Sequence, residues 1–321
     1  MKKKIDIFCT LGPSSLNRKF LKFSNANVSL LRLNMSHIKI NKLKNTIKFI
    51  KKFSKTPICI DTEGAQIRSK IKKIKYLKSN NQTINIYKNT GNFNIYPSEV
   101  FNKIKKNDIM DVGFDGLKIK VIRVKKNKLN CKVLKDGLLE NNKGIHIQNR
   151  KIKLNFITEK DKKAILIAKT MNIKHYALSF TNTYKDILKF NKLLKSEIKI
   201  FKIETKSAIN GLKKIINRGD RFLIDRGDLS KDISVEMLPT IQRKILKIAK
   251  IKNKKVYVAT NFLESMVKNK YPNRGEANDI YNTLETGAAG LVLAAETAIG
   301  KYPEECVVFL KKMIKTYLKF K

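Results

Sequence analysis

The sequence predicts an α/β protein: a closed (β/α)8 TIM barrel with a small β-barrel lid domain inserted after the third strand. Three observations lead to this fold class. Eight short apolar runs alternate with longer amphipathic stretches along the 321 residues. One connection, residues 63–174, is too long for a single helix. Within that connection, short alternating segments separated by turn residues replace the helical pattern.

The eight apolar runs are the expected barrel strands, because apolar strands that alternate with helices are typical of a parallel sheet covered by helices. They occupy residues 5–11, 28–35, 57–62, 175–180, 198–204, 221–225, 255–260 and 290–296. Helices are expected at 40–53, 159–171, 183–196, 208–217, 235–250 and 277–286, and a last helix at 304–320 would close the barrel.

The inserted domain is expected to comprise residues 69–153, between the barrel segments 1–68 and 154–321. Its predicted strands are 82–87, 93–96, 117–124 and 129–134. Turn pairs such as Asp136-Gly137 separate apolar alternation of period two, which indicates a small β domain.

The net charge of +44 leaves a nucleic-acid-binding protein open, because a basic face attracts phosphate backbones. However, 60 of the 70 basic residues are Lys, they are spread along the whole chain, and Asn occurs 31 times while Trp is absent. An AT-rich coding sequence would produce all of these biases. We therefore favour compositional drift, and expect no specific nucleic-acid partner.

Other classes of protein are excluded more firmly. No apolar stretch approaches the roughly 18 residues of a membrane span, and nothing resembles an export signal, so no membrane partner and a cytoplasmic location are expected. The four cysteines lack CxxC spacing and there are only three histidines. This argues against a zinc site and against a disulfide framework.

Polar residues follow the predicted strands at the ends where a (β/α)8 barrel places its active site. Alternation puts Lys202 and Glu204 on the same face of the fifth strand, either inside the barrel or outside beneath the helices. A buried Lys–Glu pair needs partners in either place, so a functional site is favoured over packing. The other candidates at strand ends are Thr10, Arg32, Asn34, Ser36, His37, Asp61, Thr62, Arg68, Arg226, Asp228, Thr260 and Glu296.

These residue types suit phosphoryl transfer. The carboxylates of Glu204 and Asp228 are hard oxygen ligands of the kind that Mg²⁺ or Mn²⁺ prefers. Lys202, Arg32 and Arg226 offer positive charge to phosphate and carboxylate groups, and charge neutralisation is what phosphoryl transfer mainly needs. Gly227 would let backbone amides approach an anion.

Nine segments, in order, resemble motifs of the pyruvate kinase family: 9–15, 32–37, 61–68, 201–204, 225–229, 258–266, 272–276, 295–298 and 300–303. The resemblance implies a glycolytic phosphotransferase (EC 2.7.1.40) that moves phosphate from phosphoenolpyruvate to ADP, giving pyruvate and ATP. It implies that Glu204 and Asp228 bind Mg²⁺, that Lys202 stabilises the phosphoryl group, and that Arg32 holds the phosphate.

The resemblance also implies the remaining site residues. Backbone amides near Arg226, Gly227 and Asp228, with Thr260, would hold the substrate carboxylate, and Thr260 would lie beside the route of the proton to the enolate. The expected ligands of K⁺ are Asn34, Ser36, Asp61 and Thr62, and the expected nucleotide-binding residues are Asn34, His37, Arg68 and Lys143.

The sequence departs from the family pattern at several positions. Glu63 stands where the family usually has Lys, and Gln66 leaves the dependence on K⁺ open. Asp225 replaces a small residue, and its carboxylate is expected to pair with Arg226 or to repel the carboxylate of the substrate. Ala65, Asn261 and Ala294 also depart, and the lid is shorter than usual.

The family's C-terminal regulatory domain is also expected to be absent. Asp225, Glu63 and the shortened lid motivate the second hypothesis, a divergent or weakly active relative that uses another enolpyruvyl or phosphorylated substrate. The sequence leaves open a homodimer formed through the barrel near residues 272–286.

Overall fold

The computed structural model describes residues 4–113, 116–148, 150 and 152–321, and the chain divides into two compact units. The barrel unit comprises Met1–Gly64 and Glu159–Lys321, and the insert comprises Ala65–Thr158. The predicted limits of the inserted domain, 69–153, lie within this second unit and stay a prediction.

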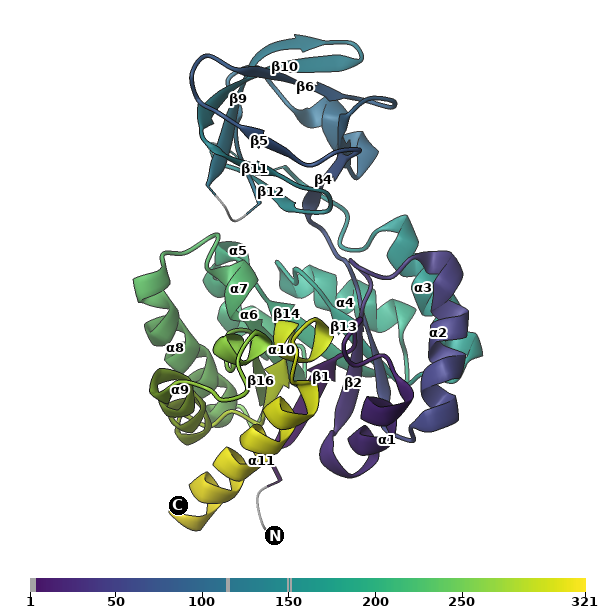
Figure 1. The fold of residues 1–321 in the computed structure, drawn as a ribbon, viewed down its shortest axis with the longest axis vertical. Helices are drawn as coiled ribbons and strands as arrows, with labels where there is room; N and C mark the ends of the chain where they lie inside the picture. The colour runs from purple at the N-terminus through teal and green to yellow at the C-terminus, as the bar shows by residue number, and fades with distance from the viewer. Residues whose placement is uncertain (1–3, 114–115, 149, 151) are drawn as a thin grey trace. The chain divides into compact units, whose positions relative to one another are not determined.

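Eight parallel strands form a closed barrel within the described part of the barrel unit, in the order β1-β17-β16-β15-β14-β13-β3-β2 (Figure 1). This confirms the predicted (β/α)8 fold class. The strands are β1 (Asp6–Thr10), β2 (Leu30–Asn34), β3 (Ile58–Asp61), β13 (His175–Leu178), β14 (Ile198–Ile203), β15 (Arg221–Asp225), β16 (Lys255–Ala259) and β17 (Gly290–Leu293).

Helices surround these strands (Figure 1), and the longer helices bury apolar side chains. In α2 (Ile40–Phe53), for example, Leu43, Ile47 and Ile50 recur at helical spacing and are fully buried. The other helices of eight or more residues are α1 (Arg18–Asn27), α3 (Glu159–Thr170), α4 (Tyr184–Leu193), α8 (Leu238–Ile251), α9 (Arg274–Glu285) and α11 (Pro303–Lys319).

Two of the predicted helices differ from the structure. The helix expected at 208–217 is two short helices, α5 (Lys206–Asn210) and α6 (Leu212–Ile216), which meet at Gly211. The helix expected at 277–286 begins earlier, because Asn273 and Glu276 form a capping box at the start of α9. The predicted helices left out α1 and two single turns, α7 (Arg226–Leu229) and α10 (Ala295–Ala298).

The insert is a β-barrel, as predicted, and the described residues contribute seven strands to it in the closed order β10-β6-β7-β4-β12-β8-β9. The strands are β4 (Ile67–Ile71), β6 (Thr83–Tyr87), β7 (Phe93–Tyr96), β8 (Ile109–Val112), β9 (Leu117–Lys125), β10 (Lys128–Lys135) and β12 (Gly144–Ile147). A two-stranded sheet of β5 (Lys75–Leu77) and β11 (Gly137–Leu139) accompanies them. Apolar side chains such as Ile86, Val121 and Leu129 fill the core of the insert.

Among the described residues, no helix combines the length and the apolar character that crossing a membrane requires.

Candidate functional site

The interior of the eight-stranded barrel begins with an apolar layer that takes residues from every strand. Its members are Phe8, Leu30, Cys59, Ala177, Ile200, Leu223, Tyr257, Ala259 and Val292. Side chains alternate between the two faces of a strand, so the residue two positions further along also points into the barrel. This alternation fixes which polar residues share the interior.

At six strands that next inward position is polar, and all six side chains are buried. We call these residues the inner polar ring: Thr10, Arg32, Asp61, Ser179, Lys202 and Asp225. Glu204 follows Lys202 by two further positions and is 1% exposed. The two orientations left open for Lys202 and Glu204 are thereby decided, since both lie inside the barrel near the carboxyl ends of the strands.

Lys202 is the centre of a network of ion pairs inside the barrel. Its Nζ lies 2.7 Å from Glu204 Oε1, 3.4 Å from Asp61 Oδ2 and 3.5 Å from Asp225 Oδ2. Arg32 Nη1 lies 3.2 Å from the same Asp61 oxygen. Three buried carboxylates therefore face two buried cations, which leaves a surplus of one negative charge in this network.

The pKa values of Lys202 and Glu204 are both raised, as a surplus of negative charge would cause. Burial by itself would lower the pKa of Lys202, but Asp61, Glu204 and Asp225 outweigh burial and hold the pKa well above its ordinary value. Burial raises the pKa of the Glu204 carboxyl, and Asp228 and Asp225 raise it further against the opposing effect of Lys202. The cation is thus strongly stabilised, whereas Glu204 resists ionisation, as expected where carboxylates outnumber cations.

Asp61 and its neighbours form the part of the site at the ends of β2 and β3. Asn34 pairs with Asp61 in the strand register, and Asn34 Oδ1 accepts a hydrogen bond from Ser36 N at 2.9 Å. Thr62 Oγ1 accepts one from Ser179 N at 2.9 Å. The structure therefore brings together the four residues predicted as K⁺ ligands.

Ser179 is a site residue that the sequence analysis missed. Its hydroxyl lies 3.2 Å from Lys202 Nζ, and it donates hydrogen bonds to Asp61 Oδ1 at 3.1 Å or to the Thr62 carbonyl at 2.6 Å. The predicted fourth strand, 175–180, contained Ser179, and counting two positions from the inward Ala177 would have singled it out. Thr10 Oγ1, which accepts from Arg32 Nε at 3.0 Å, orients the guanidinium in a similar way.

Asp225 does not pair with Arg226, so the first of the two alternatives was wrong, while repulsion of the substrate carboxylate stays a prediction. Asp225 points into the barrel toward Lys202, because it lies two positions beyond the inward Leu223. The Arg226 guanidinium instead donates two hydrogen bonds to Asp279, at 2.7 and 3.0 Å, and one through Nε to the Thr260 carbonyl at 3.0 Å. It also lies 4.3 Å from the centre of the Phe262 ring.

Thr260, directly after β16, has an unusual backbone. Its φ is +73° and that of Asn261 is +58°, in the left-handed region that a β-branched residue rarely adopts. Thr260 Oγ1 accepts a hydrogen bond from Gly227 N at 2.9 Å and donates to the Ala259 carbonyl at 2.5 Å. Backbone conformations of this kind concentrate at functional sites, and here one holds the hydroxyl against the loop 226–228.

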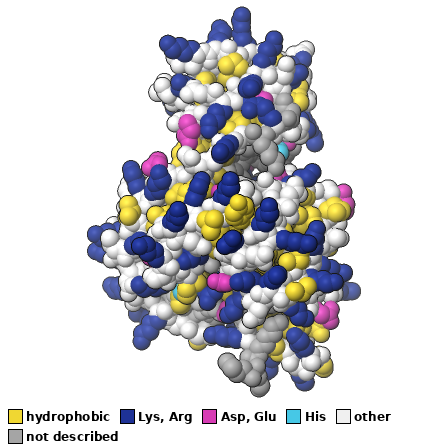
Figure 2. Space-filling model, turned by 180° about the vertical axis from the view of Figure 1, so that it is seen from behind, with side chains coloured by type: hydrophobic (Ala, Val, Ile, Leu, Met, Phe, Trp, Pro, Cys, Tyr) yellow, Lys and Arg dark blue, Asp and Glu magenta, His cyan; other side chains and the backbone are white. Residues whose placement is uncertain are grey.

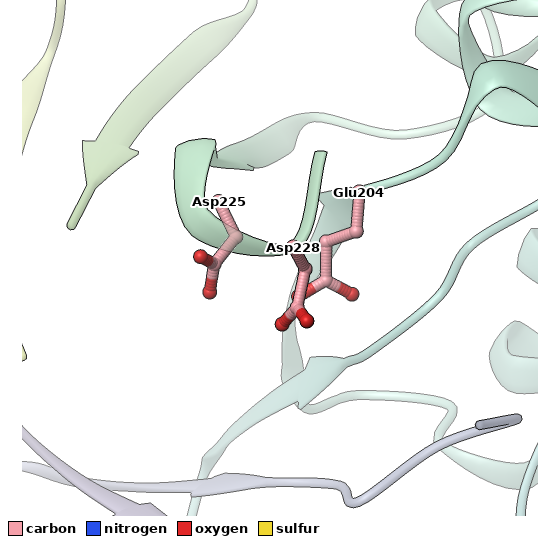
Figure 3. Close-up of side chains that lie close together, drawn as sticks. All are labelled: Glu204, Asp225 and Asp228. Atoms are coloured by element: carbon pink, nitrogen blue, oxygen red, sulfur yellow. The ribbon is translucent and has the colours of Figure 1, made fainter. Parts of the chain in front are cut away.

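Glu204, Asp225 and Asp228 form the cluster best suited to a metal ion among the described residues. One carboxylate oxygen from each lies within 4.8 Å of the others. Figure 3 shows the three carboxylates pointing to the same side of α7, the helical turn that follows β15. Glu204 Oε1 is buried and is held by the Lys202 ammonium at 2.7 Å, so a metal ion at this cluster would share Glu204 with Lys202.

Glu63, where the family usually has Lys, is buried and pairs with Lys160 of α3 at 3.3 Å. The loop that contains it is held by the fully buried Asp161, whose carboxylate accepts hydrogen bonds from Glu63 N at 2.8 Å and Gly64 N at 3.1 Å. Glu63, which departs from the family pattern, is thus paired with a nearby residue of opposite charge, Lys160.

The predicted nucleotide-binding residues fall in both units. His37 belongs to the barrel unit, and its backbone N–H donates a hydrogen bond to the Asn34 carbonyl at 3.1 Å. Arg68 and Lys143 belong to the insert, where Arg68 Nη1 lies 3.4 Å from the Asn142 carbonyl and Lys143 Nζ lies 2.8 Å from Glu140 Oε2. Gln66 also lies in the insert.

Comparison with known proteins identifies the family. A family model described as "Pyruvate kinase, barrel domain" matches residues 2–307. The chain belongs to the pyruvate kinase family. Its phosphotransferase class and its barrel with a second, smaller barrel are those expected of the family.

Three relatives named pyruvate kinase show the extent of the similarity. One from Buchnera aphidicola subsp. Schizaphis graminum is 35% identical over 98% of this chain, which spans 69% of that relative. One from Thermotoga maritima is 30% identical over 96% of the chain, which spans 70% of it. One from Staphylococcus aureus is 30% identical over 97% of the chain, which spans only 56% of it.

Proposed function

We propose that the chain catalyses Mg²⁺-dependent phosphoryl transfer from phosphoenolpyruvate to ADP, giving pyruvate and ATP. The observation that carries the proposal is the position of Lys202, a buried cation held among Asp61, Glu204 and Asp225 inside the barrel, near the carboxyl ends of the strands. A cation with such a raised pKa stays charged at neutral pH and is suited to stabilise a phosphoryl group in transit.

Glu204 and Asp228 would hold the Mg²⁺ or Mn²⁺ ion of the family. The donor set fits, since both are carboxylates and one oxygen of each lies within 4.8 Å of the other. When bound, the ion would neutralise negative charge on the phosphoryl group and the enolate. Lys202 and Arg32, both buried inside the barrel, would supply the remaining positive charge.

Thr260 and the loop 226–228 would orient the organic part of phosphoenolpyruvate. The guanidinium of Arg226 is held by Asp279, so its backbone, with those of Gly227 and Asp228, would be the part that contacts the carboxylate. The Thr260 hydroxyl, which already contacts Gly227 N, would lie beside the route by which the enolate takes its proton.

The monovalent cation and the nucleotide belong to the same proposal. Asn34, Ser36, Asp61 and Thr62 would surround K⁺, while Gln66 leaves open whether K⁺ is required. Asn34, His37, Arg68 and Lys143 would contact ADP or ATP. A measurement of molecular mass in solution would decide whether the barrel forms a homodimer through residues 272–286.

The test is a coupled assay of pyruvate formation with the full chain, phosphoenolpyruvate, ADP and Mg²⁺. Each substrate and the metal are omitted in turn, and K⁺ is exchanged for Na⁺. We expect pyruvate and ATP in equal amounts, and no product without Mg²⁺. Pyruvate no higher than in the blank would contradict the proposal.

That negative result would favour the second hypothesis, a divergent or weakly active relative, for which Asp225 and Glu63 are the motivating departures. A screen of other phosphorylated enol compounds with ³¹P NMR detection would then identify the substrate class. A nucleic-acid-binding function has less support. On the face drawn in Figure 2, Lys and Arg side chains are scattered over the surface and do not form one stripe.

A further inference from the structure

The carboxylate of Asp225 is weakly paired for a group buried in the barrel interior. Its side chain is 8% exposed, and its one ion pair, with Lys202 at 3.5 Å, is the longest of the three that Lys202 makes. No described residue donates a hydrogen bond to it. A buried carboxylate in this state destabilises the fold unless another ligand compensates its charge.

Asp225 is not needed to hold Lys202 in place. Glu204 lies closer to the ammonium at 2.7 Å, and Asp61 and the Ser179 hydroxyl hold it from β3 and the end of β13. Nor does Asp225 neutralise Arg226, because Asp279 does so. The carboxylate adds negative charge to a network that already has enough to balance its cations.

The place of Asp225 suits a metal ligand instead. One of its oxygens lies within 4.8 Å of oxygens of both Glu204 and Asp228, and Figure 3 shows the three groups directed to the same side. Oxygen ligands at about 2.0–2.6 Å from one ion are separated by about 3–5 Å, so one divalent cation can contact all three. A third carboxylate also raises the affinity of such a site, because affinity follows the number of charged ligands.

We propose that Asp225 is a third carboxylate ligand of the divalent cation and that it strengthens the binding of the ion to this chain. The proposal rests on the metal site in the proposed function and extends it by a residue that family members usually lack. An ion at this place takes Glu204 and Asp225 from the Lys202 network as ligands and leaves Asp61 as the counter-charge of Lys202.

The test measures Mn²⁺ binding to the full chain without substrate, by titration calorimetry and by the loss of the free Mn²⁺ signal in electron paramagnetic resonance. The variants are Asp225→Asn and Glu204→Gln. The matched control is Asp220→Asn, because Asp220 directly precedes the opposite end of β15 and its side chain is 88% exposed. Melting temperatures in EDTA check that each variant folds, and Asp225→Ala replaces Asp225→Asn if the latter does not fold.

We expect one Mn²⁺ ion per chain in the unsubstituted protein, a loss of affinity of at least about tenfold in Asp225→Asn and Glu204→Gln, and no change in Asp220→Asn. Unchanged affinity in Asp225→Asn together with weakened binding in Glu204→Gln would overturn this inference and leave the proposed function intact. Absence of Mn²⁺ binding to the unsubstituted chain would also overturn it, whereas the proposed function is decided separately by pyruvate formation.

Discussion

The barrel unit and the insert each bury an ion pair, and the two pairs differ in charge balance. In the insert, Asp108 is 1% exposed and accepts hydrogen bonds from Arg150 Nε at 2.8 Å, Arg150 Nη2 at 2.6 Å and Lys105 N at 2.8 Å. In the barrel, one ammonium, Lys202, faces three carboxylates, and Asp225 receives no hydrogen bond from the described residues.

The difference separates a structural ion pair from a site that is prepared for a ligand. One carboxylate with one bidentate guanidinium and a backbone N–H is satisfied within the protein, so it needs nothing from solution. A cluster with surplus carboxylates is stable only with a further cation or with raised pKa values, as for Glu204. Burial of charge alone therefore does not identify the site, whereas imbalance of buried charge does.

The largest effect is expected from removing the central cation of the barrel. Lys202→Met should lower the rate of phosphoryl transfer by at least about 10²–10³-fold, since charge stabilisation of this kind is worth that much. It also leaves three buried carboxylates without Lys202, so the metal-free melting temperature should fall and added Mn²⁺ should restore part of it. Steady-state kinetics and thermal melts with and without Mn²⁺ measure both.

Lys199→Met is the matched control, because Lys199 lies on the same strand and its ammonium donates to the backbone carbonyls of Leu194 and Lys195. It should keep near-normal turnover. Normal turnover in Lys202→Met would show that Lys202 has no catalytic role. An unchanged melting temperature would show that the surplus of buried carboxylates does not lower the stability of the barrel.

The strands and the inward positions could be read from the sequence, because alternation of period two and apolar runs are local patterns. The same alternation, applied from Ala177 and Leu223, also gives the inward direction of Ser179 and Asp225. The partners of Arg226 could not be read, since Asp279 is brought to it by the packing of α9, far along the chain. The five insert strands not predicted are short or contain charged residues, so their pattern is weak, and the break at Gly211 depends on a single residue.

A smaller effect is expected from breaking the balanced pair of the insert. Arg150→Met leaves Asp108 buried without its main partner, so the free energy of unfolding of the insert should fall by about 1–3 kcal/mol. Arg150 is 29% exposed, which is why the value stays below that of a fully buried pair. Hydrogen exchange of the β8 and β9 amides in the full chain measures it.

Arg123→Met, an exposed arginine on β9, is the control and should leave exchange unchanged. Equal protection in Arg150→Met and the unsubstituted chain would mean that Asp108 finds another donor, and the balanced pair would then not be the structural element described above.

The smallest effect concerns pH, and it sharpens the same contrast. Burial would raise the pKa of Asp108, but the hydrogen bonds and charge of Arg150 and the Lys105 N–H outweigh burial and lower it below its ordinary value. A carboxylate with a lower pKa in the folded chain adds stability above the unfolded pKa of about 3.9, and that stability is lost as the pH falls below it. Asp108→Asn lacks this titration. We therefore compare the protection of the β8 and β9 amides from hydrogen exchange in the unsubstituted chain and in Asp108→Asn. The difference should be largest at neutral pH and shrink between about pH 4 and pH 2. A difference that stays constant over that range would mean that Asp108 contributes through packing and not through its charge.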